Sequence, residues 1–340
     1  MLKSFHKMLS VAALVFLGAP FGTVQGDEPD RAQARNRIVR VVTVSQDGLR
    51  PSADTLTVET MERLDLAASF RPDIACLPET FTLREPESLP GPTSELLSAW
   101  AREHHCYVVF SIHVQSGEHK YNSAVLIDRE GAIVGRYDKI RPTEGELDKS
   151  VCPGAVDLPV FETDFGKIGM QICFDVNWHD QWRQLKEKGA QIVFFPSAYP
   201  AARHLKTHAW LNQYFIVSST KGRPSSIYDI AGEQMATSGR FQYWAGAEIP
   251  LGMRMFEIDF HTRKMREIAA KYGPRVRITW YHDDDLVSLA SLDPDLTVDD
   301  IIAEFELTPH TDYLERCRQV QDEYRSTKGP DVASQTSAAN

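Results

Sequence analysis

The sequence predicts an α/β fold in which helices cover the faces of buried sheets, and three observations support this fold class. From residue 37 onward, short apolar runs alternate with segments whose apolar residues recur at helical spacing. Several runs, such as 38–44 and 192–195, are apolar almost throughout, which is typical of strands buried on both faces. The chain has 340 residues, of which 42% are hydrophobic and 25% charged, enough for a sizeable globular core.

The expected elements follow one another closely along the chain. Strands are expected at 38–44, 74–77, 107–113, 123–127, 133–137, 167–173, 192–195, 215–218, 226–230 and 253–258. Helices are expected at 56–70, 94–104, 182–188 and 201–214. The sequence Asp-Arg-Glu-Gly at 128–131 predicts a hairpin turn. Strands joined mostly through helices indicate a layered α/β domain.

The composition changes only near the two ends of this alternation. No linker interrupts it before residue 275, so we predict one main domain over 37–275, preceded by a polar linker at 27–36. Residues 276–324 contain acidic, helix-like sequence and are expected to form a C-terminal extension that packs on the domain or on a partner. Residues 325–340 are small and polar, which predicts a disordered tail.

The first 26 residues have the pattern of a secretory signal peptide. Lys3 and Lys7 precede an apolar run at 9–19, and small residues end at Gly26 before an acidic pair. The run is too short to span a bilayer. We therefore expect export to the periplasm or the medium after cleavage near Gly26, with a retained N-terminal anchor as the alternative.

Charge and cysteine content limit the possible partners. The formal net charge is −10, which disfavours nucleic acid and anionic membrane surfaces as partners after signal removal. The 5 cysteines are irregularly spaced, and their odd number leaves a thiol that could serve as a nucleophile. The sequence has no CxxC pattern and no Cys/His ligand cluster, so a structural zinc site is not expected.

Three predicted strands end at side chains that could carry chemistry. Glu79 follows the strand at 74–77, Lys139 follows 133–137, and Cys173 ends the strand at 167–173. Sites in α/β sheets assemble at the carboxyl ends of strands, where a following turn can also stabilise a thiolate or an oxyanion. Taken singly, Cys173 also fits a buried structural cysteine, and Glu79 and Lys139 fit solvated surface.

Taken together, the segments around these residues resemble the nitrilase superfamily, the carbon–nitrogen hydrolases. The resemblance lies in Leu-Pro-Glu-Thr at 77–80, Tyr-Asp-Lys-Ile-Arg-Pro-Thr at 137–143 and Gly-Lys-Ile-Gly-Met-Gln-Ile-Cys-Phe-Asp at 166–175. Segments at 195–198, 209–213 and 226–229 support it. The resemblance implies a four-layer α-β-β-α sandwich that assembles as a homodimer or higher homo-oligomer.

The resemblance also implies a Glu-Lys-Cys triad that needs neither a metal nor a cofactor. Glu79 would be the general base, Lys139 the cation that stabilises the oxyanion, and Cys173 the nucleophile. This division of roles agrees with chemistry, because a thiol is mostly protonated at neutral pH and needs a base. A second carboxylate is implied shortly after the lysine. The spacing favours Glu146, and Glu144 is the alternative.

The residues after the nucleophile predict the pocket and the branch of the superfamily. The expected pocket residues are Phe174, Asn177, Trp178, Ser197, Ala198 and Tyr199, and ordinary packing is the alternative interpretation for them. Phe174 and Asp175 follow Cys173 where nitrilases usually have Trp-Glu, which looks more like amidases and N-carbamoyl amidohydrolases. We therefore expect hydrolysis of a small linear amide or N-carbamoyl compound.

Several other interpretations remain open from the sequence. Nitrile hydrolysis or acyl transfer would use the same triad, and a catalytically silent binding protein would keep only the fold. His204 and His208 lie four residues apart, but the glutamate of a metalloprotease motif is missing. Residues 283–285 are all Asp, yet they lack the Gly and Glu of a calcium loop, so a solvated acidic run is expected.

Overall fold

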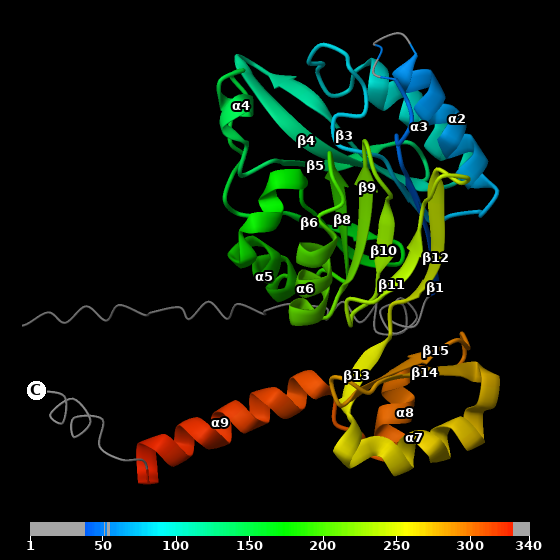
Figure 1. Ribbon diagram of the computed structural model, residues 1–340, viewed down its shortest axis with the longest axis vertical. Coiled ribbons are helices and arrows are strands. Elements are labelled where there is room, and N and C mark those ends of the chain that lie inside the picture. Colours follow the sequence, from blue (N-terminus) through cyan, green and yellow to red (C-terminus); the bar gives the residue numbers. More distant parts are fainter. Residues whose placement is uncertain (1–37, 51, 53–54, 329–340) are drawn as a thin grey trace, which may run out of the picture.

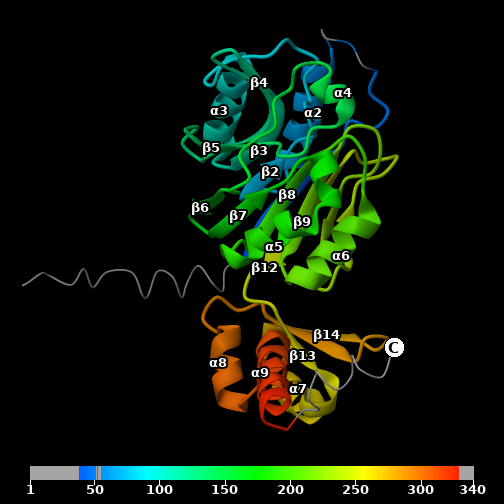
Figure 2. The same ribbon diagram turned by 90° about the vertical axis from the view of Figure 1, so that its left-hand side faces the viewer.

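The computed structural model describes residues 38–50, 52 and 55–328. The predicted signal peptide at 1–26 and the linker at 27–36 lie outside the described residues. Two units are visible: a large sandwich and, beyond its strand β12, a smaller C-terminal unit (Figure 1). A turned view separates the same two units (Figure 2). None of the described helices is both long and apolar enough to cross a membrane.

The first sheet of the sandwich has the strand order β12-β1-β2-β3-β4-β5. Its strands are β1 (Ile38–Val44), β2 (Ile74–Cys76), β3 (Tyr107–Ser116), β4 (His119–Ile127), β5 (Ile133–Asp138) and β12 (Trp244–Pro250). Strands β1, β2 and β3 are parallel, and the other neighbours are antiparallel. Helices α2 (Leu56–Ala68) and α3 (Pro92–His104) cover the outer face, where Leu64 and Leu97 join the core.

The second sheet has the order β11-β10-β9-β8-β7-β6. Its strands are β6 (Val160–Thr163), β7 (Gly166–Met170), β8 (Ile192–Ser197), β9 (Phe215–Thr220), β10 (Ser226–Tyr228) and β11 (Gln234–Thr237). Strands β7, β8 and β9 are parallel. Helices α5 (His179–Glu187) and α6 (Ala202–Asn212) cover its outer face through residues such as Trp182 and Leu205.

The two sheets pack face to face, as strand β1 illustrates. Val39 and Val41 belong to the core cluster that also contains Ile192 and Ile216 of the second sheet. Val42 and Val44 instead belong to the cluster under α2 and α3. Because successive side chains on a strand point to opposite faces, one nearly continuous apolar run supplies both layers. The predicted α-β-β-α sandwich is confirmed.

The C-terminal unit has a sheet and a core of its own. It contains β13 (Arg254–Glu257), α7 (Ile258–Tyr272), η2 (Gly273–Arg275), β14 (Val276–Tyr281), β15 (Leu286–Ser291) and α8 (Val298–Phe305), with sheet order β13-β15-β14. Phe256 of β13 and Ile268 of α7 share a buried cluster with Val287 and Ile301. The boundary predicted at residue 275 falls inside this unit. The unit begins near Arg254 because β13 pairs with β15 rather than with a strand of the sandwich.

Helix α9 (His310–Lys328) runs outward from the C-terminal unit (Figure 1). Most of its side chains are exposed, and intrahelical ion pairs such as Arg318–Glu315 and Arg325–Asp322 lie along it. The predicted disordered tail began at residue 325, but the helix continues to Lys328. These charged pairs at helical spacing support the last turn. Residues 329–340 lie outside the described part of the chain.

Candidate active site

The three strand-end residues come from both sheets and meet at one edge of the sandwich. Glu79 follows β2, Lys139 directly follows β5, and Cys173 begins the short 3₁₀ helix η1 (Cys173–Asn177) after β7. Cys173 has a φ of 46°, and Thr80, next to Glu79, has a φ of 38°. Non-glycine residues seldom adopt this left-handed conformation, and such strain is concentrated at functional sites. The backbone is thus bent sharply beside two of the three groups.

Lys139 joins two carboxylates in the interior. Its ammonium group donates to Glu79 Oε1 at 2.9 Å and to Glu146 Oε1 and Oε2 at 3.0 and 2.8 Å. The lysine is 1% exposed and Glu79 is 5% exposed. Burial lowers the pKa of Lys139, but the charges of Glu79, Cys173 and Glu146 outweigh this and raise it above its usual value. The lysine therefore stays positively charged.

Glu146, and not the alternative Glu144, is the carboxylate that contacts Lys139. Glu146 lies in the short helix α4 (Glu144–Leu147), whose N-terminus Thr143 caps by accepting from Glu146 N. Burial raises the pKa of Glu146, but the charge and hydrogen bonds of Lys139, together with hydrogen bonds from Thr143 and Asn122, hold it below its usual value. Glu144 is exposed.

Asn122 was not identified from the sequence, yet it bridges the two carboxylates. Its Nδ2 donates to Glu79 Oε1 and to Glu146 Oε1, both at 2.8 Å, while Ser111 Oγ donates to its Oδ1 at 3.0 Å. Both contacts to Glu79, from Asn122 and Lys139, use Oε1. Among the residues that the structure describes, no group donates to Glu79 Oε2. This leaves one carboxylate oxygen able to accept a proton.

Cys173 is buried beside these charges. Burial and the negative charge of Glu79 raise the pKa of the thiol to about 12, although Lys139 and hydrogen bonds from Ala198 and Ser197 act in the opposite direction. At neutral pH the resting side chain is therefore a thiol. It can become a nucleophile only if a base removes its proton.

Asp175 holds the nucleophile turn against the lysine loop. Its carboxylate accepts from Tyr137 Oη at 2.8 Å, from Arg141 N at 2.9 Å and from Ile172 N at 3.1 Å. The sequence singled out Asp175 only as an indicator of the branch. Because its partners flank Lys139 on one side and Cys173 on the other, Asp175 fixes their separation.

The predicted pocket residues occupy different places around the thiol. Phe174 and Trp178 pack edge to face at 5.1 Å and line, with Arg141 and the α4 loop, an open cavity of about 720 Å³. Ser197 is fully buried and Ala198 hydrogen-bonds the thiol through its backbone. Burial raises the pKa of Tyr199, and the charges of Cys173 and Glu79 raise it further.

The side chain of Asn177 is engaged within its own turn. Its amide donates to the carbonyl of Phe174 at 2.9 Å, and the residue is exposed. It therefore stabilises the η1 turn.

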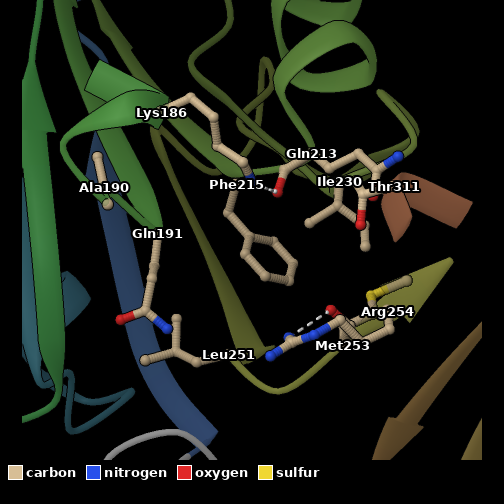
Figure 3. Close-up of a pocket in the computed structure, with 11 residues that line it drawn as sticks. Lys186, Ala190, Gln191, Gln213, Phe215, Ile230, Leu251, Met253, Arg254 and Thr311 are labelled. Carbon is tan, nitrogen blue, oxygen red and sulfur yellow. Dashed lines mark hydrogen bonds between the residues drawn. The ribbon is translucent and has the colours of Figure 1, made fainter. Parts of the chain in front are cut away.

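A second cavity lies away from these residues. It is formed between the sandwich and the C-terminal unit (Figure 3) and lined by Lys186, Gly189, Ala190, Gln191, Gln213, Phe215, Ile230, Leu251, Met253, Arg254 and Thr311. Gln191 directly precedes β8 and Phe215 begins β9, whereas Ser197 ends β8. This cleft is thus at the opposite end of those strands from Cys173.

The two histidines four residues apart have unrelated surroundings. His208 is buried, stacks on Trp182 at 4.2 Å and bonds the carbonyl of Val176 through Nε2, whereas His204 is exposed. Within the described ranges, no group of three His, Cys, Asp or Glu side chains is placed to hold a metal ion. All five cysteines lie in those ranges and are unpaired.

A sequence model described as "Carbon-nitrogen hydrolase" matches residues 38–254, most of the sandwich. The chain belongs to the carbon-nitrogen hydrolase family. This match stops at the first residue of β13, so the C-terminal unit lies outside it.

Relatives of this carbon-nitrogen hydrolase include enzymes with several names. A β-ureidopropionase of Arabidopsis thaliana is 31% identical over 50% of this chain and 48% of its own length. A deaminated glutathione amidase of Synechocystis is 26% identical over 45% of this chain and 64% of its own. The chain therefore spans about half to two thirds of the length of these curated relatives.

Solved structures support the same fold. Nit3 of Saccharomyces cerevisiae, a member of branch 10 of the nitrilase superfamily, has a TM-score of 0.58 and 18% identity, covering 68% of this chain and 95% of its own. An amidase of Nesterenkonia has a TM-score of 0.56 and 18% identity, covering 64% and 92%. Both likenesses concern the fold alone.

Proposed function

We propose that this hydrolase cleaves the C–N bond of a small linear amide or N-carbamoyl compound through a thioester on Cys173. The observation that carries the proposal is the cluster in which Glu79, Lys139 and Glu146 are hydrogen-bonded beside a buried thiol. The names β-ureidopropionase and deaminated glutathione amidase, which belong to the relatives, point to the same two substrate classes.

In the first half-reaction, Glu79 Oε2 takes the proton of Cys173 as sulfur attacks the carbonyl carbon. Two donors of Lys139 stay on Glu146, and the third, which contacts Glu79 in the resting site, can turn toward the developing oxyanion. The N–H of Phe174 is the second donor to the oxyanion. When the tetrahedral intermediate collapses, the protonated Glu79 gives its proton to the leaving nitrogen. An amide thereby releases ammonia and leaves an acyl thioester.

In the second half-reaction, water replaces the amine. Glu79 removes a proton from water, hydroxide attacks the thioester carbonyl, and the thiol leaves with the proton returned by Glu79. An amide yields the free carboxylic acid. An N-carbamoyl compound yields the amine in the first step, and its carbamate decomposes to carbon dioxide and ammonia after the second.

Ammonia release on a mixed panel tests the proposal. The panel holds short aliphatic amides, ω-amides of dicarboxylates, N-carbamoyl amino acids and nitriles, assayed with wild type, Cys173→Ala and Cys106→Ala. Cys106 is a matched control because it is also buried but lies in the core cluster under α2 and α3. We expect release from amides or carbamoyl compounds that only Cys173→Ala abolishes. Release from nitriles alone, or activity kept in Cys173→Ala, would contradict the proposal.

Export and self-assembly remain proposals of their own. We propose that the chain is cleaved near Gly26 and acts in the periplasm or medium as a homodimer or larger homo-oligomer. N-terminal sequencing of the exported protein and light scattering of the purified protein test these two statements. An intact N-terminus in the membrane fraction, or a monomeric mass, would contradict them.

A further inference from the structure

A second lysine, Lys221, lies at the same edge of the sandwich as the triad. It directly follows β9, and its backbone N–H donates to the carbonyl of Ser197 at 3.1 Å. Its ammonium group donates to Thr80 Oγ1 at 2.6 Å. Thr80 is the neighbour of Glu79, and Ser197 hydrogen-bonds Cys173. Lys221 is therefore tied to two residues that flank the general base and the nucleophile.

The surroundings of the two lysines differ in one respect. Lys139 is paired with two carboxylates, whereas Lys221 forms no ion pair with any residue in the described part of the chain. Lys221 is nevertheless half-buried. Lysines are seldom buried without a charged partner, because desolvating an ammonium group is costly.

The charged groups around Lys221 leave its ammonium group without a direct negative partner, so an anion could bind there. Burial lowers the pKa of Lys221, and Lys139 lowers it further, while Glu79, Cys173 and Glu146 act in the opposite direction. Burial lowers the pKa of His113 on β3, and the charges of Lys120 and Lys221 lower it further. The site thus contains one cation, Lys139, that is paired with both carboxylates and a second, Lys221, that contacts neither of them.

We propose that Lys221 binds the carboxylate of the substrate, so that this enzyme prefers ω-amides or N-carbamoyl derivatives of carboxylic acids over neutral amides. This inference rests on the proposed function, because it places the substrate's carboxylate at Lys221 while the scissile carbon of the same substrate faces Cys173. Thr80 holds the ammonium group in place from the β2 side, and the substrate supplies the negative partner that the chain does not.

Matched substrates separate this role from a structural one. Succinamate and butyramide have the same amide and a similar length but differ in the carboxylate, as do N-carbamoyl-β-alanine and butylurea. The variants are Lys221→Met, which keeps the chain length without charge, Lys221→Arg, and the control Lys206→Met on the exposed side of α6. Each enzyme is assayed for kcat and KM on all four compounds.

We expect Lys221→Met to lower kcat/KM for the two acids by about 100-fold, mainly through KM, because a buried charge-assisted contact is lost. Activity on butyramide and butylurea should change less than about threefold, Lys221→Arg should recover part of the loss on acids, and Lys206→Met should behave as wild type. An equal loss on acids and neutral amides, or no preference for acids in wild type, would overturn the inference.

A binding measurement keeps the test independent of turnover. Succinate should inhibit wild type competitively and bind Cys173→Ala, and the additional substitution Lys221→Met should remove that binding. Succinate binding that survives without Lys221 would also overturn the inference. Failure of the proposed function looks different, because then neither acids nor neutral amides would be hydrolysed in a Cys173-dependent manner.

Discussion

The two ends of strands β8 and β9 have very different surroundings. At their carboxyl ends, Ser197 and Lys221 adjoin Glu79, Lys139 and Cys173, and polar groups there are buried and joined by hydrogen bonds across both sheets. At their amino ends, the cleft against the C-terminal unit is lined by buried apolar side chains such as Phe215 and Leu251 and by exposed or half-exposed polar ones such as Lys186 (Figure 3). Of these two regions, the first holds charges at close, fixed distances in low dielectric, where electrostatic catalysis is strong.

The largest effect is expected where removing one group leaves two like charges together. Lys139→Met leaves Glu79 and Glu146 buried without their shared cation, so it should lower the free energy of unfolding by about 3–5 kcal/mol. We expect kcat/KM for amides to fall by about 1,000-fold or more, because the oxyanion also loses its donor. Chemical denaturation and ammonia release measure the two effects. A variant as stable as wild type would show that the pair is not buried as described.

Glu146→Gln should have a smaller effect that depends on pH. The substitution keeps the shape but weakens the contact to Lys139, so kcat/KM should fall by about 10- to 100-fold, as for one charge-assisted hydrogen bond. Because the folded protein holds the pKa of Glu146 below its ordinary 4.5, its stabilising effect is present above that pH and is lost on acidification. The difference in melting temperature between wild type and Glu146→Gln should therefore shrink as the pH is lowered from 7 through 4.5 and beyond. A difference that grows on acidification would contradict this assignment.

Asp175→Asn should show the opposite pH dependence. Burial raises the pKa of Asp175 from 3.8 to about 6, so its ionisation weakens the folded state as pH rises through that interval. The variant loses acceptors for Tyr137, Arg141 or Ile172 and should be less stable than wild type, but the difference should shrink between pH 4 and pH 6. Thermal melts at matched ionic strength measure this, and kcat should fall by about 10-fold with KM little changed, as for a lost hydrogen bond. A stability difference that grows over this interval would contradict the assigned pKa.

The smallest effect is expected in the other cleft. Lys186 is exposed and its ammonium group donates to the carbonyl of Gln213 at 3.2 Å. Lys186→Met should change stability by no more than about 0.5 kcal/mol and leave amide hydrolysis within about twofold of wild type. A large loss of activity would show that the two ends of the strands are coupled and would undo the comparison.

The strand-end logic explains how much of this could be predicted. Glu79, Lys139 and Cys173 each follow a recognisable apolar run, so their common edge could be anticipated from the sequence. Asn122 could not, because its role depends on which strands lie near one another in the first sheet. Lys221 was missed although it follows an apolar strand, and the same logic applied to β9 would have found it.

The missed elements have local causes as well. Strand β12 reads Trp-Ala-Gly-Ala-Glu-Ile-Pro, whose Gly, Ala and Pro content is poor strand sequence, and its pairing with β1 is what makes it a strand. Helix α7 starts at Ile258, the last residue of the strand expected at 253–258. The C-terminal unit was consequently divided at residue 275, because its sheet forms through the pairing of β13 with the later β15.

The central claim is that Cys173 is the nucleophile held beside Glu79 and Lys139. Partial alkylation with iodoacetamide, itself an amide, tests it most directly when the labelled fraction of each of the five cysteines is determined by peptide mass spectrometry and compared with residual ammonia release. We predict that activity falls in proportion to labelling of Cys173 alone and that substrate protects against both. Full activity in protein whose Cys173 is completely alkylated would contradict the account.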